Sequence, residues 1–239
     1  SDLRNSFAFG TTYFEDYNFS IAVDVNLLEV QPLGYTSTQA NAHYIYRLNL
    51  TYDWVLNTAL SIGYGNNRLD NSLIFEDQIN VLTGNIAGVS IDPVNANNTV
   101  GYFDMGIGAH AHNSRNMFFG LNFKHINQPE TSFNVGNSQK RELLISAQAG
   151  YEIELNPYRR GAFSTNSYLF LYSSVAQQGK KLRADFYQEL ILDNITFGIN
   201  QNINSFNGAS ITTMGASASI LLEQVEVGAN YSFELASKQ

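Results

Sequence analysis

The chain has 239 residues, of which 44% are hydrophobic and 14% charged, so it is too apolar to be disordered and long enough for one large β domain. Its net charge of −8 argues against a nucleic-acid partner, because binding phosphates requires clusters of Lys and Arg. The chain contains no cysteine, which excludes a disulfide scaffold and thiol chemistry. We expect a single domain over residues 1–239.

Apolar and polar residues alternate along most of the chain with the period of two that predicts β-strands. In one such segment, Ile145 and Ala147 alternate with Ser146 and Gln148. Many of the segments have ten or more residues, which is more than the average strand of a soluble protein. In chain order, the predicted strands are 5–14, 17–28, 40–52, 54–66, 101–112, 115–126, 140–155, 161–174, 181–192, 194–204, 210–221 and 223–235.

The connections between these strands alternate between tight turns and longer loops. Tight turns are expected near 15–16, 53, 113–114, 156–160, 193 and 222–223. Longer loops are expected at 29–39, 67–100, 127–139, 175–180 and 205–209. Because tight turns on one side and long loops on the other are typical of outer-membrane barrels, we predict an all-β, transmembrane, up-and-down antiparallel β-barrel. Its apolar face would meet lipid and its polar face an aqueous lumen.

A soluble β-sandwich is the alternative fold, since its strands also alternate apolar and polar side chains. Three features favour the membrane barrel: the length of the strands, the unbroken up-and-down order, and a polar face rich in Gly, Ser, Asn and Gln. Aromatic residues such as Tyr52 and Trp54 also gather toward strand ends, as they do in the interfacial girdles of membrane barrels. We therefore expect the cell outer membrane as the location.

The segment SLIFEDQIN, residues 72–80, opens the longest loop. In a second segment, YFDMGIGAHAHNSRNMFFGLNFKHINQPETSF, residues 102–133, a Gly-rich strand, a tight turn and a strand ending in HINQP follow one another. Both segments, and the order of elements in the second, resemble the PorP/SprF family of outer-membrane proteins from the type IX secretion system. The resemblance implies a barrel of about fourteen strands with periplasmic termini. Because the twelve predicted strands begin and end on the long-loop side, we expect one strand to be absent from each end.

The resemblance also implies a function. The expected role is a non-enzymatic one in type IX secretion and gliding motility, in which the barrel anchors or helps deliver one secreted cell-surface protein with a C-terminal sorting domain. Outer-membrane lipid and other secretion components in the periplasm would be further partners. A passive diffusion channel for small solutes is the main alternative. An outer-membrane enzyme is the weaker one, because the sequence has no Gly-x-Ser-x-Gly motif and no P-loop.

Two sets of polar residues are candidate metal sites. His110 and His112 lie two residues apart on one strand, so they share a face and could share a metal. A pair of polar wall residues is the preferred interpretation, because no third ligand stands at a useful spacing. A calcium site in the long loop is likewise less favoured than a plain polar loop; its ligands would be Asp92, Asn95, Asn97 and Asn98. We expect no metal and no cofactor.

Partner contacts are expected in the long loops, which carry more apolar residues than a bare surface loop needs. These residues are Leu33, Tyr35, Ile86, Val89, Ile91, Val94 and Phe133. The alternative is that they pack on one another and close the barrel mouth. With the resemblance, the predicted partner-binding residues are His125, Asn127, Gln128, Pro129, Phe133, Ile86 and Ile91. The alternation of the preceding strand assigns His125 to the lipid-facing side, at the outer end of that strand, where it would either lie in the membrane interface or begin the loop.

Overall fold

The computed structural model describes residues 3–31, 34–70, 74, 76–81, 83–86, 88, 90, 98–133, 138–158, 166–206, 209–222 and 225–238. Its strands are β1 (Leu3–Phe14), β2 (Phe19–Val30), β3 (Tyr35–Asn49), β4 (Trp54–Leu69), β5 (Thr99–Asn113), β6 (Met117–Lys124), β7 (Leu144–Glu154), β8 (Ser167–Gln178), β9 (Lys181–Leu192), β10 (Ile195–Phe206), β11 (Ala209–Leu222) and β12 (Val225–Lys238). Two 3₁₀ turns are described as well, η1 (Glu15–Tyr17) and η3 (Glu76–Gln78).

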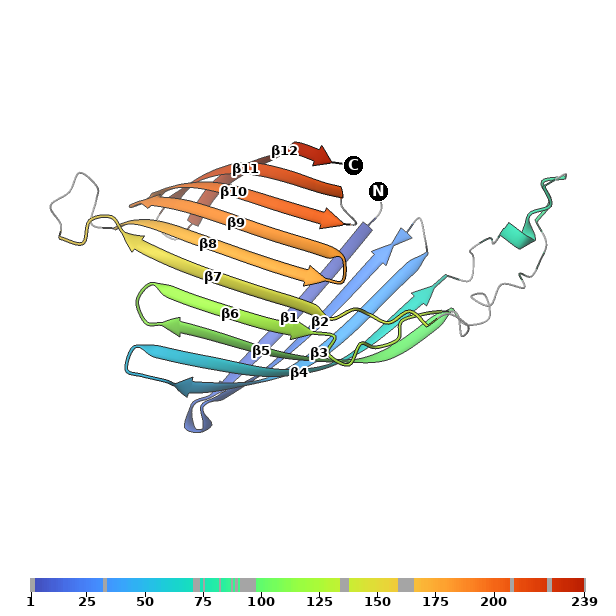
Figure 1. Cartoon of the computed structure of the whole chain (residues 1–239), viewed down its shortest axis with the longest axis horizontal. Helices are drawn as coiled ribbons and strands as arrows, with labels where there is room; N and C mark the ends of the chain where they lie inside the picture. The colour runs from blue at the N-terminus through green and yellow to red at the C-terminus, as the bar shows by residue number, and fades with distance from the viewer. Residues whose placement is uncertain are drawn as a thin grey trace. The chain divides into compact units, whose positions relative to one another are not determined.

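The twelve strands form one sheet in which each strand is hydrogen-bonded to its neighbours in sequence (Figure 1). The described registers are antiparallel; β8, for example, pairs with β7 on one side and with β9 on the other. The prediction of an all-β, up-and-down antiparallel fold with twelve strands in this chain is therefore confirmed. Within the described residues, no helix is long and apolar enough to cross a membrane.

The chain divides into two compact units. Unit 1 comprises 1–46, 59–107 and 124–143. Unit 2 comprises 47–58, 108–123 and 144–239. Strands β3, β4, β5 and β6 each contribute residues to both units. We describe each unit by itself.

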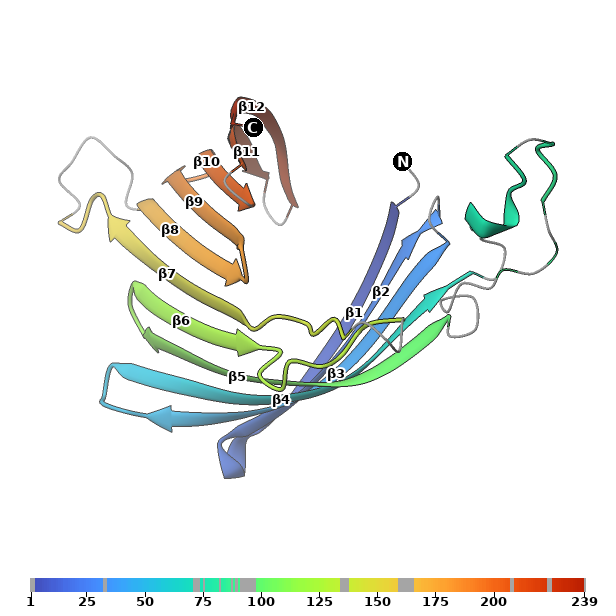
Figure 2. The same cartoon turned by 45° about the vertical axis from the view of Figure 1, so that its right-hand side comes forward.

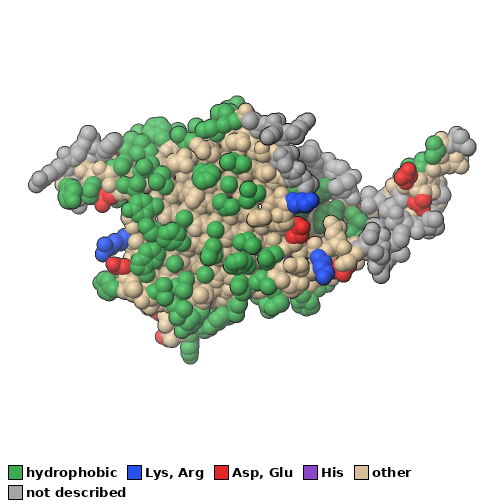
Figure 3. All heavy atoms as spheres, in the orientation of Figure 1, with side chains coloured by type: hydrophobic (Ala, Val, Ile, Leu, Met, Phe, Trp, Pro, Cys, Tyr) green, Lys and Arg blue, Asp and Glu red, His purple; other side chains and the backbone are tan. Residues whose placement is uncertain are grey.

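The alternation of side chains gives the sheet two different faces. On β5, Phe103 is 72% exposed on the apolar face, whereas Tyr102 and Asp104 on the polar face are each 5% exposed. Hydrophobic side chains cover much of the strand surface that is visible in Figure 3, where charged side chains are few. In the described part of the chain, the buried hydrophobic side chains are Val55 and Tyr102. The apolar faces of these strands therefore stay exposed, the reverse of a water-soluble protein with an apolar core.

Several strand ends differ from the predicted ones. The strand predicted at 115–126 ends at Lys124, and the one predicted at 140–155 begins at Leu144. The described residues between them, 125–133 and 138–143, belong instead to a loop that is described below. The strand predicted at 161–174 lies at Ser167–Gln178, and the loop predicted at 29–39 is shorter because β2 extends to Val30 and β3 begins at Tyr35. Alternation alone could not locate these ends, because it continues into loops by chance.

A pair of cysteines can test the register, because the natural chain contains none. Ser146 of β7 faces Ala176 of β8, so their Cα atoms should lie about 4.5–5.5 Å apart, within disulfide range. We expect the Ser146→Cys/Ala176→Cys variant to form an intramolecular disulfide on mild oxidation, detected by mass spectrometry. The control Ser146→Cys/Val175→Cys places the thiols on opposite faces and should stay reduced. Efficient oxidation of the control instead would show that the register is wrong.

Candidate functional site

Residues 125–143, called here the 125–143 loop, connect β6 to β7. The structure describes 125–133 and 138–143 of this loop, and these two segments pair with each other. Glu130 pairs with Lys140 in an antiparallel bridge. The Thr131 backbone N–H donates to the Gln139 carbonyl at 3.0 Å, and the Arg141 N–H donates to the Pro129 carbonyl at 2.8 Å. Figure 2 shows the loop, in yellow-green, running between β6 and β7. It is attached to β5 at three places, all within unit 1.

The first attachment is made by His125, which is 4% exposed. Its Nδ1 lies 2.7 Å from Oδ2 of Asp104 on the polar face of β5, and Gln39 of β3 donates to the same oxygen at 2.9 Å. The assignment of the His125 side chain to the lipid-facing side is therefore wrong, whereas the alternative that His125 begins the loop is confirmed. Strand β6 ends one residue earlier, and the left-handed backbone of His125, with φ of 61°, breaks the alternation that the expectation extended.

Hydrogen bonds extend from this attachment across the polar face. Gln39 Nε2 also donates to Oδ1 of Asn41 at 3.1 Å. Asn41 Nδ2 donates to Oδ1 of Asp24 at 2.9 Å, and the other oxygen of Asp24 lies 2.6 Å from Nε2 of His43. The network thus joins β2, β3 and β5 to the loop through Asp104. Both contacts of Asp104 use Oδ2, and its Oδ1 is buried with no hydrogen-bond partner among the described residues. The network therefore holds these side chains in place through one carboxylate oxygen.

The second attachment is made by Arg141 at the other end of the loop. Its Nη1 donates to the hydroxyl of Tyr102 at 2.7 Å, and its Cζ lies 5.7 Å from the centroid of the Tyr102 ring. The Tyr102 ring in turn rests on Gly65 of β4, where an added Cβ would stand 2.2 Å from the Tyr102 Cζ. Glycine is therefore required at this position, because any side chain would displace the ring that Arg141 contacts.

The third attachment extends the ladder of β5 beyond the end of β6. The Ile126 backbone N–H donates to the Met105 carbonyl at 3.1 Å. The side chain of Asn127 then takes the place of a strand backbone, since Oδ1 accepts from the Met105 N–H at 3.1 Å and Nδ2 donates to the Phe103 carbonyl at 2.8 Å. These bonds satisfy backbone groups that the shorter β6 does not reach.

The predicted partner-binding residues fall into two places. His125, Asn127, Gln128, Pro129 and Phe133 belong to the 125–143 loop, where His125 and Pro129 are buried, Phe133 is half-buried, and Asn127 and Gln128 are exposed. Ile86 is 57% exposed and lies in a separate bridge with Ile79. Ile91 lies outside the described residues. As partner contacts, these residues stay predictions.

The site residues predicted from the sequence do not include the four residues that anchor the loop, which are Asp104, Gln39, Tyr102 and Arg141. The alternation along 101–112 places Asp104 and Tyr102 on the polar face, but it carries no information on what they contact there. A buried carboxylate needs hydrogen-bond donors, so an Asp among glycines on a polar strand face was the available signal.

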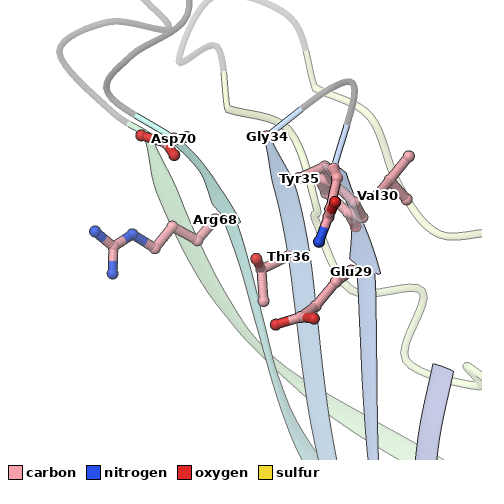
Figure 4. A pocket seen from close by; sticks show the side chains of 8 residues that line it. Glu29, Val30, Gly34, Tyr35, Thr36, Arg68 and Asp70 are labelled. Carbon is pink, nitrogen blue, oxygen red and sulfur yellow. The ribbon is translucent and has the colours of Figure 1, made fainter. Parts of the chain in front are cut away.

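The other predicted loop residues have varied outcomes. Tyr35 lines a cavity of 370 Å³ at one end of β2, β3 and β4, together with Glu29, Arg68 and Asp70 (Figure 4). The side chains around Tyr35 are therefore mostly polar. In that view, the side chain of Arg68 points away from Glu29. The remaining apolar candidates, Leu33, Val89 and Val94, lie outside the described residues.

The described candidate metal ligands lie next to aromatic rings or a backbone carbonyl. The ring of His110 lies 5.7 Å from that of His112 and 5.5 Å from that of Phe118, measured between centroids. Over the described part of the chain, no group of three or more His, Cys, Asp or Glu residues could hold a metal ion. Asn98 donates to the Leu69 carbonyl at 3.3 Å. The other candidate calcium ligands, Asp92, Asn95 and Asn97, lie outside the described residues.

Substituting Asp104 should loosen the 125–143 loop. Asp104→Ala would leave the buried His125 Nδ1 and the Gln39 amide without their shared acceptor, at a cost of about 1–3 kcal/mol. We expect faster backbone hydrogen exchange at Thr131 and Arg141, measured by mass spectrometry. The control is Asp53→Ala, which removes a more exposed carboxylate, 3.4 Å from Arg115, and should leave the loop unchanged. Equal exchange in the Asp104 variant and the natural chain would contradict an anchoring role.

Comparison with known proteins identifies the family. No curated protein matches the chain by sequence. A family model described as "Type IX secretion system membrane protein PorP/SprF" matches residues 2–239, essentially the whole chain. The resemblance drawn from 72–80 and 102–133 is thereby confirmed. The chain belongs to the PorP/SprF family of type IX secretion system membrane proteins.

Proposed function

We propose that this chain is an outer-membrane β-barrel that holds or helps deliver one secreted cell-surface protein of the type IX secretion system. The observation that carries the proposal is the 125–143 loop, which three separate attachments hold on the polar face of unit 1. A loop ordered before its partner arrives costs less conformational entropy when the partner binds. The role itself is non-enzymatic, and the family is a component of secretion and not a known enzyme family.

Exposure of the strands supports the membrane location. Large apolar side chains on one face of the strands, such as Ile62 and Phe103, are more than half exposed, which is unfavourable in water and favourable in lipid. A membrane-spanning strand needs about 9–11 residues, and most of the strands exceed that length, as β4 and β5 do. Outer-membrane lipid is therefore a proposed partner. Further secretion components on the periplasmic side are another.

The proposed cargo is a secreted protein with a type IX C-terminal sorting domain, docked at the 125–143 loop. Gln128 and the apolar side chain of Ile126, which is 43% exposed, face outward between the attachments and offer a mixed polar and apolar contact. Phe133 lies farther along the same loop. His125 and Asn127 would act by fixing the loop, since their side chains are engaged with β5.

Deleting the gene should abolish surface display of the cognate cargo while other type IX substrates are still exported. In complementation, Gln128→Ala/Phe133→Ala should reduce the cargo that co-purifies about tenfold, as expected when a contact worth about 1.4 kcal/mol is lost. Glu15→Ala, in the exposed turn η1, serves as the control and should restore full display. Undiminished display in the deletion strain would disprove the proposal.

A passive diffusion channel is the second candidate function. It is favoured by the small polar side chains on the polar faces of β10 and β11, such as Asn200, Asn202 and Ser217. In the natural chain, however, Tyr102, Phe118 and the 125–143 loop project from the polar face.

Planar bilayer recordings separate the two functions. We expect low or no steady conductance from the purified protein, because bulky side chains and an anchored loop narrow any aqueous path. Large, stable, ohmic steps would favour the channel instead.

A further inference from the structure

An apolar cavity interrupts the polar face of unit 2 at one end of β7 to β11. Direct cross-strand neighbours share a face, and two adjacent rows of them line this cavity. The first row is Leu144, Gln178, Lys181 and Phe206. The second is Ala176, Arg183, Asn204 and Ile211. Strands β7 to β10 lie side by side in Figures 1 and 2.

The apolar residues of the cavity stand where the pattern calls for polar ones. Farther along the same face, β10 carries Asn200 and Asn202, whereas this end carries Phe206, which is 51% exposed, and Ile211, which is 46% exposed. Exposed apolar side chains beside water are unfavourable unless something covers them. The cavity has a volume of 560 Å³, within the range of sites that bind small ligands or short peptide segments.

Two cations stand at this cavity. Lys181 Nζ lies 5.6 Å from the centroid of the Phe206 ring. Arg183 Nε donates to Oδ2 of Asp185 at 2.9 Å, and Ser174 donates to the same carboxylate, which holds the guanidinium in place and balances its charge. The described residues that line the cavity include no Asp or Glu. Lys181 therefore gives the cavity a positive charge, although the net charge of the whole chain is −8.

We propose that this cavity binds a short peptide segment that carries apolar side chains next to a carboxylate. The apolar side chains would cover Leu144, Phe206 and Ile211, and the carboxylate would accept hydrogen bonds from Lys181 and Arg183. Leu182 and Ser205 of the apolar face also line the cavity. A peptide is favoured over a lipid because Leu144, Phe206, Ile211 and both cations belong to the polar face, whereas lipid would contact the apolar one. The chemistry of the cavity supports a peptide ligand independently of the proposed function. That the peptide belongs to a secreted partner rests on the proposed function.

Fluorescence anisotropy on the purified full chain in detergent tests the site. The probe is a labelled peptide amide, Gly-Ser-Leu-Phe-Glu-Leu, compared with the same peptide carrying Gln in place of Glu. We expect the Glu peptide to bind about tenfold more tightly, as one charge-assisted hydrogen bond allows. Phe206→Ala should weaken binding of both peptides about tenfold, and Lys181→Gln should remove the preference for Glu.

Matched controls exclude a general effect of substitution. Phe197→Ala removes a ring from the same strand that is also 51% exposed but lies on the opposite face, and Lys180→Gln removes the neighbouring cation. Both should bind the peptides as the natural chain does. Absence of binding, equal binding of the two peptides, or unchanged binding by Phe206→Ala overturns the proposal. Peptide binding together with normal cargo display in the deletion strain would instead retain the site and disprove the proposed function.

Discussion

Successive side chains of a β-strand point to opposite faces, and the other features of this protein depend on that constraint. It places an apolar row and a polar row on every strand, so one alternating sequence determines two surfaces at once. Antiparallel pairing then aligns like rows across neighbouring strands, as the registers of β7 to β11 show. An exposed apolar face and a polar face that carries hydrogen-bond networks are the result.

In each unit, the polar face carries a feature that a uniform surface of small polar side chains would lack. In unit 1, Asp104 is buried on this face and is stabilised by donors from β3 and from the end of β6. A buried carboxylate without such donors would cost several kcal/mol, so this position selects the residues around it. In unit 2, Asp185 is engaged by Arg183 and Ser174 in a similar way. In both units a carboxylate fixes side chains that would otherwise be mobile.

The two proposals assign different binding roles to the features of the two units. The 125–143 loop offers a surface that is ordered by Asp104, Tyr102 and Met105 before any partner binds. The cavity at Phe206 offers an apolar site next to two cations. A protein that only enclosed water would need neither feature, whereas a protein that holds an extended or folded partner can use both.

Alternation in the sequence is enough to establish the fold class, the number of strands in this chain and the two faces, because it is a local property, and the distinctive HINQP region indicates the family. Alternation also places Tyr102 and Asp104 on the polar face. The direction of the His125 side chain, in contrast, depends on the backbone path in three dimensions, since one residue with positive φ reverses a side chain without any change in the pattern. The same holds for the contact of Arg141 with Tyr102 over Gly65 and for the meeting of Leu144, Phe206 and Ile211 at one cavity. These contacts join residues far apart in sequence, and their geometry depends on register and loop path, which local periodicity does not encode.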